Sequence, residues 1–78
     1  MIIELGKHLL DGVYCSFVLE SYIYGSGYRL AAYLDEDSCR YYDINHLASA
    51  YISGNYKVAP IWFELYNSDL FQKALLLI

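Results

Sequence analysis

The sequence predicts a small α+β domain, in which an antiparallel meander sheet of three or four strands packs against one or more helices. Its first half alternates apolar and polar residues between turn signals, as strands do. Its second half carries N-cap residues followed by apolar residues at helical spacing. This segregation of strands from helices is typical of the α+β class. Hydrophobic residues make up 58 % of the 78 residues, above the roughly 45–50 % of ordinary domains. We therefore expect one ordered domain over residues 1–78.

The first predicted element is a strand over Ile2–Leu10. Asp11-Gly12 follows it and precedes another apolar run, a pattern typical of a two-residue hairpin turn. A short helix over Ile2–Leu10 that stops at Gly12 is the alternative. Gly6 weakens that helix, so the strand is favoured.

The second predicted strand covers Val13–Tyr24 and is followed by the turn Gly25-Ser26-Gly27. Alternation at period two divides this strand between two faces. The core face is predicted to hold Val13, Cys15, Phe17, Leu19 and Ile23. The opposite, mixed face carries Tyr14, Ser16, Val18, Glu20, Tyr22 and Tyr24.

The chain is expected to return as a strand over Tyr28–Leu34. One side of this strand should bear Tyr28, Leu30, Ala32 and Leu34, and the other should bear Arg29, Ala31 and Tyr33. The acidic tip Asp35-Glu36-Asp37-Ser38 then reverses the chain into a further strand over Cys39–Tyr42.

A helix is predicted to begin after Asp43, which is a favoured N-cap residue. Its expected apolar face consists of Ile44, Leu47, Ala48, Tyr51 and Ile52, which follow helical spacing. Gly54-Asn55 is a usual signal for the end of a helix.

The last third of the chain is expected to contain a short extended connector and one or two more helices. Tyr56–Ala59 should be extended because Pro60 disfavours helix in the residue before it. Pro60–Tyr66 is either a helix with proline in its first turn or an edge strand. Asn67-Ser68-Asp69 is predicted to cap a final helix over Leu70–Leu77. The shared face of that helix should bear Leu70, Ala74 and Leu77.

No motif of the sequence predicts catalysis, a metal site or a cofactor. The soft ligands His8, Cys15, Cys39 and His46 lack the spacing of a zinc site. No glycine-rich oxyanion turn accompanies the cysteines, which are expected to be free thiols of a reducing compartment. The acidic tip lacks the glycine and closing glutamate of a calcium loop. We therefore expect a protein that is not an enzyme.

The charge and hydropathy patterns limit the expected partners. Five basic residues spread singly along the chain make no patch for phosphates, so direct nucleic-acid binding is not expected. No segment is apolar enough to be read as a membrane span, and the N-terminus lacks the pattern of a signal peptide. The expected location is the cytosol of the host cell.

Ten tyrosines in a chain of net charge -4 are its most informative feature. A domain of this size cannot bury ten phenols, and tyrosine is well suited to protein-binding surfaces. Acidic residues add a preference for a basic partner. The predicted partner-binding residues are Tyr22, Tyr24, Tyr33, Asp35, Glu36 and Asp37. The alternative is that these phenols only pack against one another across the sheet.

The segment Tyr28–Gly54, with its hairpin, acidic tip, third strand and Asp43-Ile44-Asn45-His46-Leu47 helix start, resembles a family of phage proteins. These are the small inhibitors of bacterial defence, especially anti-CRISPR proteins. The resemblance concerns the layout of about a third of the chain, so no functional residue is transferred. It implies a stoichiometric inhibitor that occupies a basic, nucleic-acid-handling surface without catalysis or cofactor.

Two other functions fit the same composition. An antitoxin or immunity protein that caps a toxin would use the same acids and tyrosines. A structural homodimer would instead cover apolar surface, such as the terminal Leu75-Leu76-Leu77-Ile78, with its own copy.

Overall fold

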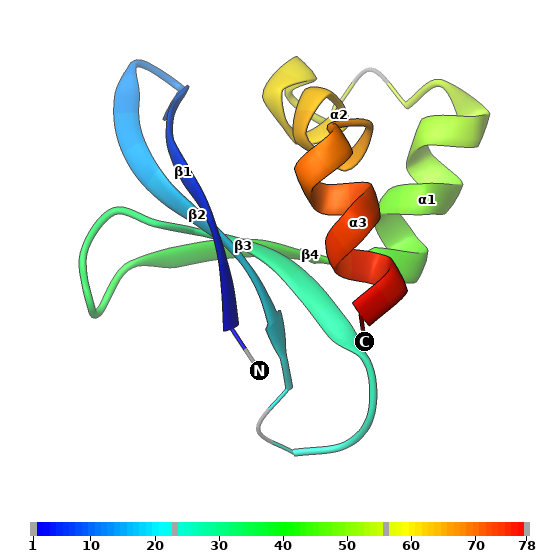
Figure 1. The fold of residues 1–78 in the computed structure, drawn as a ribbon. Coiled ribbons are helices and arrows are strands. Elements are labelled where there is room, and N and C mark those ends of the chain that lie inside the picture. Colours follow the sequence, from blue (N-terminus) through cyan, green and yellow to red (C-terminus); the bar gives the residue numbers. More distant parts are fainter. Residues whose placement is uncertain (1, 23, 56, 78) are drawn as a thin grey trace.

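The computed structural model describes residues 2–22, 24–55 and 57–77 and confirms the α+β prediction. Four antiparallel strands form one meander sheet in the order β1-β2-β3-β4. The helices gather on one side of this sheet and leave its other face open (Figure 1). The strands are β1 Ile2–Leu10, β2 Val13–Ser21, β3 Tyr28–Tyr33 and β4 Cys39–Asp43, and the helices are α1 Ile44–Ser53, α2 Pro60–Tyr66 and α3 Asp69–Leu77. Among the described residues, no helix is long and apolar enough to cross a membrane.

The hairpin between β1 and β2 forms at the predicted turn. Asp11 has φ 51° and Gly12 has φ 81°, so both central residues adopt the positive φ that a type I′ turn requires. Leu10 faces Val13 across this turn. The strand interpretation of Ile2–Leu10 is therefore correct, and the helix alternative is wrong.

A β-bulge in β1 is a feature that the sequence analysis did not predict. The register shifts between Glu4 and Lys7, and Gly6 has φ 88°, which glycine adopts without strain. The extra residue changes the alternation, so that Leu5 and Leu10 both face the helices and are buried. Without the bulge, the charged Lys7 would point into the core.

The core lies between the sheet and the helices. Its fully buried large side chains come from β2, β3, α1 and α3 and are Phe17, Leu19, Leu30, Leu47 and Phe71. Trp62 of α2 packs edge-on against the rings of Phe17 and Tyr42. The expected core face of β2 is thus correct from Cys15 to Leu19. Ile23 lies outside the described residues, and β2 ends at Ser21 rather than at Tyr24.

Two residues expected in the core are exposed because the sheet extends beyond the helices. Val13 begins β2 and Leu34 follows β3, and both lie at the end of the sheet near the β1–β2 turn. Their alternation with Cys15 and Ala32 is correct, but no described helix covers this end.

Helix α1 begins and ends as predicted, with a different buried face. The Asp43 side chain accepts a hydrogen bond from the backbone of Asn45 at 2.9 Å, and Gly54 closes the helix in the left-handed conformation. Leu47 and Ala50 are the buried residues of this helix. Ile52, which was expected on the apolar face, is 85 % exposed.

Tyr51 was expected in the core and instead lies at its margin. Its ring packs against Phe63 at 5.6 Å and Tyr66 at 5.8 Å, but the residue remains exposed. The helix packs on the sheet through Leu47, which belongs to the predicted stripe, and through Ala50, which does not, so that Tyr51 is turned toward solvent.

Pro60–Tyr66 is a helix, so the edge-strand alternative is wrong. Pro60 occupies the first turn of α2, and Trp62 and Leu65 are buried. Of the predicted connector Tyr56–Ala59, Tyr56 lies outside the described residues.

Helix α3 begins one residue earlier than predicted and buries a different face. Ser68 Oγ accepts a hydrogen bond from the backbone of Phe71 at 3.2 Å, so Ser68 caps the helix. Phe71 and Ala74 are buried. Leu70 and Leu77, which were predicted to share the core face, are exposed.

Candidate functional site: the open face of the sheet and its acidic tip

The open face of the sheet is built from the side chains that alternate with the core residues. Its central row is Val18, Ala31 and Tyr41, which face one another across β2, β3 and β4. Ala31 is 0 % exposed although the described helices all lie on the other side of the sheet (Figure 1). Its small side chain is therefore covered by the longer side chains of its neighbours on the sheet.

Arg29 is the centre of this covering layer. Its Nε lies 3.3 Å from Glu20 Oε1, and its Nη2 donates a hydrogen bond to the Tyr33 hydroxyl at 3.4 Å. The guanidinium carbon lies 4.3 Å from the centre of the Tyr41 ring and 5.7 Å from that of Tyr22, within cation–π range. Three tyrosines and one carboxylate thus surround a single arginine.

We call Arg29, Glu20, Tyr22, Tyr33 and Tyr41 the arginine cluster. Contacts within it shift the pKa values of Tyr33 and Arg29. The Tyr33 hydroxyl donates a short hydrogen bond to Glu20, and this bond, together with partial burial, raises the pKa of Tyr33. Partial burial lowers the pKa of Arg29, but the hydrogen bond to Tyr33 and the Glu20 charge outweigh it, so the net shift is upward. Arg29 stays cationic and Tyr33 stays neutral at physiological pH. The cluster is therefore a stable positive centre within an acidic face.

Tyr22 connects the cluster to the start of α1. Its hydroxyl donates to Asp43 Oδ2 at 3.2 Å, while the other oxygen of Asp43 caps α1. Burial and this hydrogen bond raise the pKa of Tyr22. The ring also lies edge-on to Tyr41, with centroids 6.3 Å apart. Tyr22 is thus held in place by the sheet and by the helix cap together.

Tyr24 is the most exposed of the three tyrosines among the predicted site residues. It is 91 % exposed and borders a shallow depression together with Glu20, Tyr22 and Arg29. Its ring is therefore open to solvent, next to residues that are held by contacts with Arg29 and Glu20.

The acidic tip lies at the other end of β3. Asp35 Oδ1 accepts hydrogen bonds from the backbone of Asp37 at 2.9 Å and of Ser38 at 2.8 Å. These bonds make a compact turn and leave Glu36 and Asp37 exposed. Asp35 and Glu36 border a second depression with Ser16 and Tyr33. The tip therefore adjoins Tyr33 on the open face of the sheet.

The six predicted site residues thus form one stripe along the sheet. It runs from Tyr24 through Tyr22 to Tyr33 and ends at Asp35, Glu36 and Asp37. We call this surface the tyrosine stripe and define it by these six residues together with Arg29, Glu20 and Tyr41. Sequence reasoning missed the last three as site residues. Period-two alternation placed Arg29 and Glu20 on this face, but only the register of β4 brings Tyr41 over Arg29.

Formal charge is distributed unevenly between the two sides of the molecule. The open face and the tip bear the acids Glu4, Glu20, Asp35, Glu36, Asp37 and Asp43 and the bases Lys7 and Arg29. This surface alone accounts for the net charge of -4. The rest of the molecule is neutral. Lys57 and Lys73 balance Glu64 and Asp69 in the helical layer, and Asp11 of the β1–β2 turn pairs with Arg40 of β4. The electric field of the protein therefore attracts cations chiefly to the open face.

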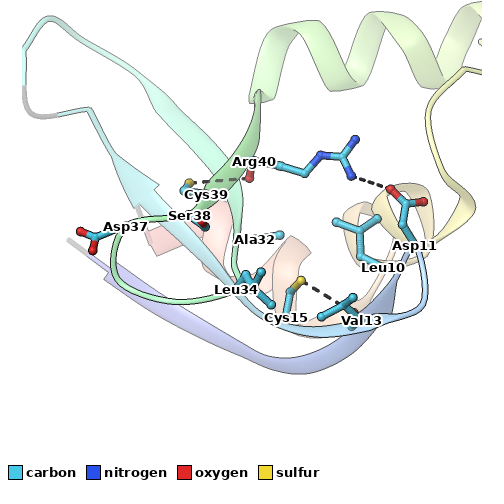
Figure 2. Close-up of a pocket in the computed structure, with 10 residues that line it drawn as sticks. All are labelled: Leu10, Asp11, Val13, Cys15, Ala32, Leu34, Asp37, Ser38, Cys39 and Arg40. Carbon is cyan, nitrogen blue, oxygen red and sulfur yellow. Dashed lines mark hydrogen bonds and ion pairs between the residues drawn. The ribbon is translucent and has the colours of Figure 1, made fainter.

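An apolar pocket of about 470 Å³ lies behind the acidic tip, on the helix side of the sheet. Figure 2 shows Leu10, Val13, Cys15, Ala32 and Leu34 around it. Arg40 extends from β4 to pair with Asp11 of the β1–β2 turn at one rim, and Asp37 and Ser38 lie at the opposite side. The hydrogen bond to Asp11 raises the pKa of Arg40. The acidic tip thus adjoins Tyr33 on the open face of the sheet and this pocket on the helix side.

Candidate metal ligands are not gathered anywhere in the described part of the chain: no group of three or more His, Cys, Asp or Glu side chains could hold a metal ion. Cys15 is a buried free thiol and Cys39 is an exposed one. The open face combines oriented aromatic rings, one embedded cation and an acidic margin. Searches of protein-family models, curated proteins and solved structures find no match to this chain.

Proposed function

We propose that this protein is a stoichiometric inhibitor that binds a basic protein surface through the tyrosine stripe. The observation that carries the proposal is that the net negative charge and a group of tyrosines lie on the same face of the sheet. All of the net charge lies on the open face and its tip, where Tyr22, Tyr24, Tyr33 and Tyr41 also gather. Tyrosine contributes large contact area at low entropic cost, and complementary charge accelerates encounter with a basic partner.

The internal contacts of Arg29 support a surface that is organised before the partner arrives. A side chain that is already held loses little conformational entropy on binding. Tyr22 is held by Asp43, and Tyr33 is held by Glu20 and Arg29. Tyr24 lies exposed at one end of the stripe, where its ring can contact the partner beside side chains that are already held in position.

The partner that we favour is a nucleic-acid-handling complex of bacterial defence, in the manner of anti-CRISPR proteins. Surfaces that hold nucleic acid are strongly basic, so an acidic, aromatic face can compete for them. The inhibitor would act in the cytosol of the host cell, without cofactor or catalysis and without contact to the nucleic acid itself.

A phage plating assay tests this function. The chain is expressed in bacteria with active CRISPR immunity, one strain for each defence type, and plaque formation by a targeted phage is measured. Purified RNA-guided nuclease complexes from the same strains serve as the binding probe. We expect restored plaque formation and direct binding in at least one strain. Wild-type protein that neither binds any complex nor restores plaques would overturn the anti-defence proposal, and rescue of growth on co-expression with a toxin would favour the immunity function.

Matched variants test the surface. Glu36→Gln with Asp37→Asn removes two charges from the tip, and Glu64→Gln with Asp69→Asn removes the same charge from the helical layer. We expect only the tip variant to slow association and to weaken its salt dependence. Tyr24→Ala should cost about 2 kcal/mol or more of binding free energy if Tyr24 is a hot spot. Equal effects of the tip and helical-layer variants would place the interface elsewhere.

A further inference from the structure

Strand β1 has a free edge. Within the described residues, it pairs with β2 and with no other strand. It is 9 residues long, whereas an average strand has about 5–6 residues. A long edge strand presents unpaired backbone N–H and C=O groups that can accept another strand.

The outer side chains of β1 have a self-complementary order. Ile2, Glu4, Lys7 and Leu9 all lie on the open face, because they alternate with Ile3, Leu5, His8 and Leu10 around the bulge. All four are exposed, and the two apolar members are 67 % exposed for Ile2 and 52 % for Leu9. Read from either end, the order is apolar, charged, charged, apolar, and the two charges are opposite.

We propose that two copies of the chain pair through β1, antiparallel, around a twofold axis that passes between Leu5 and Gly6. In this register Ile2 faces the partner's Leu9 and Glu4 faces the partner's Lys7. The symmetry repeats each contact, so the interface contains two apolar pairs and two opposite-charge pairs. Directly opposed pairs of both kinds stabilise antiparallel strands.

The direction in which the backbone N–H and C=O groups of β1 point agrees with this register. The two-residue turn at Asp11-Gly12 makes Leu10 and Val13 a hydrogen-bonded pair, so Leu10 and His8 point their backbone groups toward β2. Lys7 and Leu9 therefore point theirs outward, and beyond the bulge Glu4 and Ile2 do the same. Each facing pair in the dimer is thus a pair that can exchange backbone hydrogen bonds.

The bulge fits the dimer because it lies on the axis. A bulge in an edge strand usually deters pairing, since it interrupts the alternation of outward groups. Here the interruption at Leu5 and Gly6 of one copy faces the same interruption in the other copy. On both sides of the axis, the residues whose backbone groups point outward in one copy therefore still face such residues in the other copy. The dimer would contain one continuous sheet whose two open faces lie on the same side. Both tyrosine stripes, with their acidic tips, would then face the same way.

Charge exchange tests the interface. The oligomeric state of the full chain is measured by sedimentation and light scattering over a concentration series. Glu4→Lys places lysine opposite lysine twice in each interface, and Lys7→Glu places glutamate opposite glutamate. We expect each single variant to weaken dimerisation about tenfold or more, and the double variant Glu4→Lys with Lys7→Glu to restore it. Lys73→Glu on α3 is the control for net charge and should leave dimerisation close to that of wild type.

Three results would overturn the proposal. The first is a wild-type chain that is monomeric across the concentration series. The second is a dimer that neither single variant weakens, which would place the contact on another surface. The third is a double variant that dissociates as readily as the single variants, which would show that the two residues do not face each other. Circular dichroism of every variant verifies that the monomer fold is retained.

Discussion

Replacement of Leu47 by alanine gives the sharpest test of how α1 packs. Leu47 is 0 % exposed and lies among the largest buried side chains of the core. Truncating a buried leucine to alanine costs about 2–5 kcal/mol, through lost burial and the cavity that remains. A domain of this length has a total free energy of unfolding of roughly 4–12 kcal/mol. The change therefore removes a large share of the stability, and Tm should fall by roughly 10–30 °C.

Ile52→Ala is the matched control, because helical spacing assigns both residues to one apolar face. The structure leaves Ile52 85 % exposed, so its truncation should change the free energy of unfolding by at most about 0.5 kcal/mol. Leu47→Asp should prevent folding, since it would bury an unpaired charge.

Unfolding is followed in urea and by heating, with far-UV circular dichroism and the fluorescence of Trp62. Trp62 is the single tryptophan of the chain and is buried against Phe17 and Tyr42, so its emission reports the same core. Comparable losses for Leu47→Ala and Ile52→Ala would refute the packing described for α1. An unperturbed Leu47→Ala variant would refute the location of the core itself.

Three further predictions concern the bulge, the helix cap and the cluster. Gly6→Ala should destabilise the fold by about 1–2 kcal/mol in chemical denaturation, because alanine is strained at positive φ. Asp43→Ala should cost about 0.5–2 kcal/mol by loss of the α1 cap, whereas Asp43→Asn should retain most of it. The raised pKa of Tyr33 means that its stabilising contribution is complete below the ordinary tyrosine pKa of about 10 and is lost as pH rises through the higher folded value. Tyr33→Phe should therefore show a smaller loss of stability in alkaline titration than wild type, and an identical alkaline profile would contradict the role of the Glu20 contact.

Features that depend on neighbouring residues in the chain were predictable from the sequence. Local signals left Pro60–Tyr66 open between a helix and an edge strand, and the structure shows a helix. The Asp11-Gly12 turn, the Asp43 cap and the Gly54 helix end were predicted and are all present in the structure. Each depends on backbone conformation or on a hydrogen bond within a few residues, so sequence order alone determines it. The α+β class follows, because these signals separate the strands from the helices.

The candidate site was predictable only in outline. Alternation at period two placed Tyr22, Tyr33, Glu20 and Arg29 on the open face, as the structure has them. It could not reveal that Arg29 gathers the rings, because that contact joins β2, β3 and β4 and depends on the register of Tyr41 in the last strand.

By itself, the sequence determined the order of most strands and helices, the Asp11-Gly12 turn and the cap of α1, and that phenols and acids outnumber what a small core can use. It did not decide between helix and edge strand for Pro60–Tyr66, and it placed the end of β2 and the start of α3 incorrectly. Only the tertiary structure decided which residues are buried. Leu34 alternates correctly with core residues and yet faces solvent, because the sheet extends past the helices. Ile52 faces solvent because α1 packs through Leu47 and Ala50 rather than through the whole predicted stripe. The physical reason is that periodicity defines a face of an element, whereas burial depends on where another element lies against it. The Gly6 bulge shows the same dependence, since the register shift stabilises the protein only because Leu5 and Leu10 both join the core cluster.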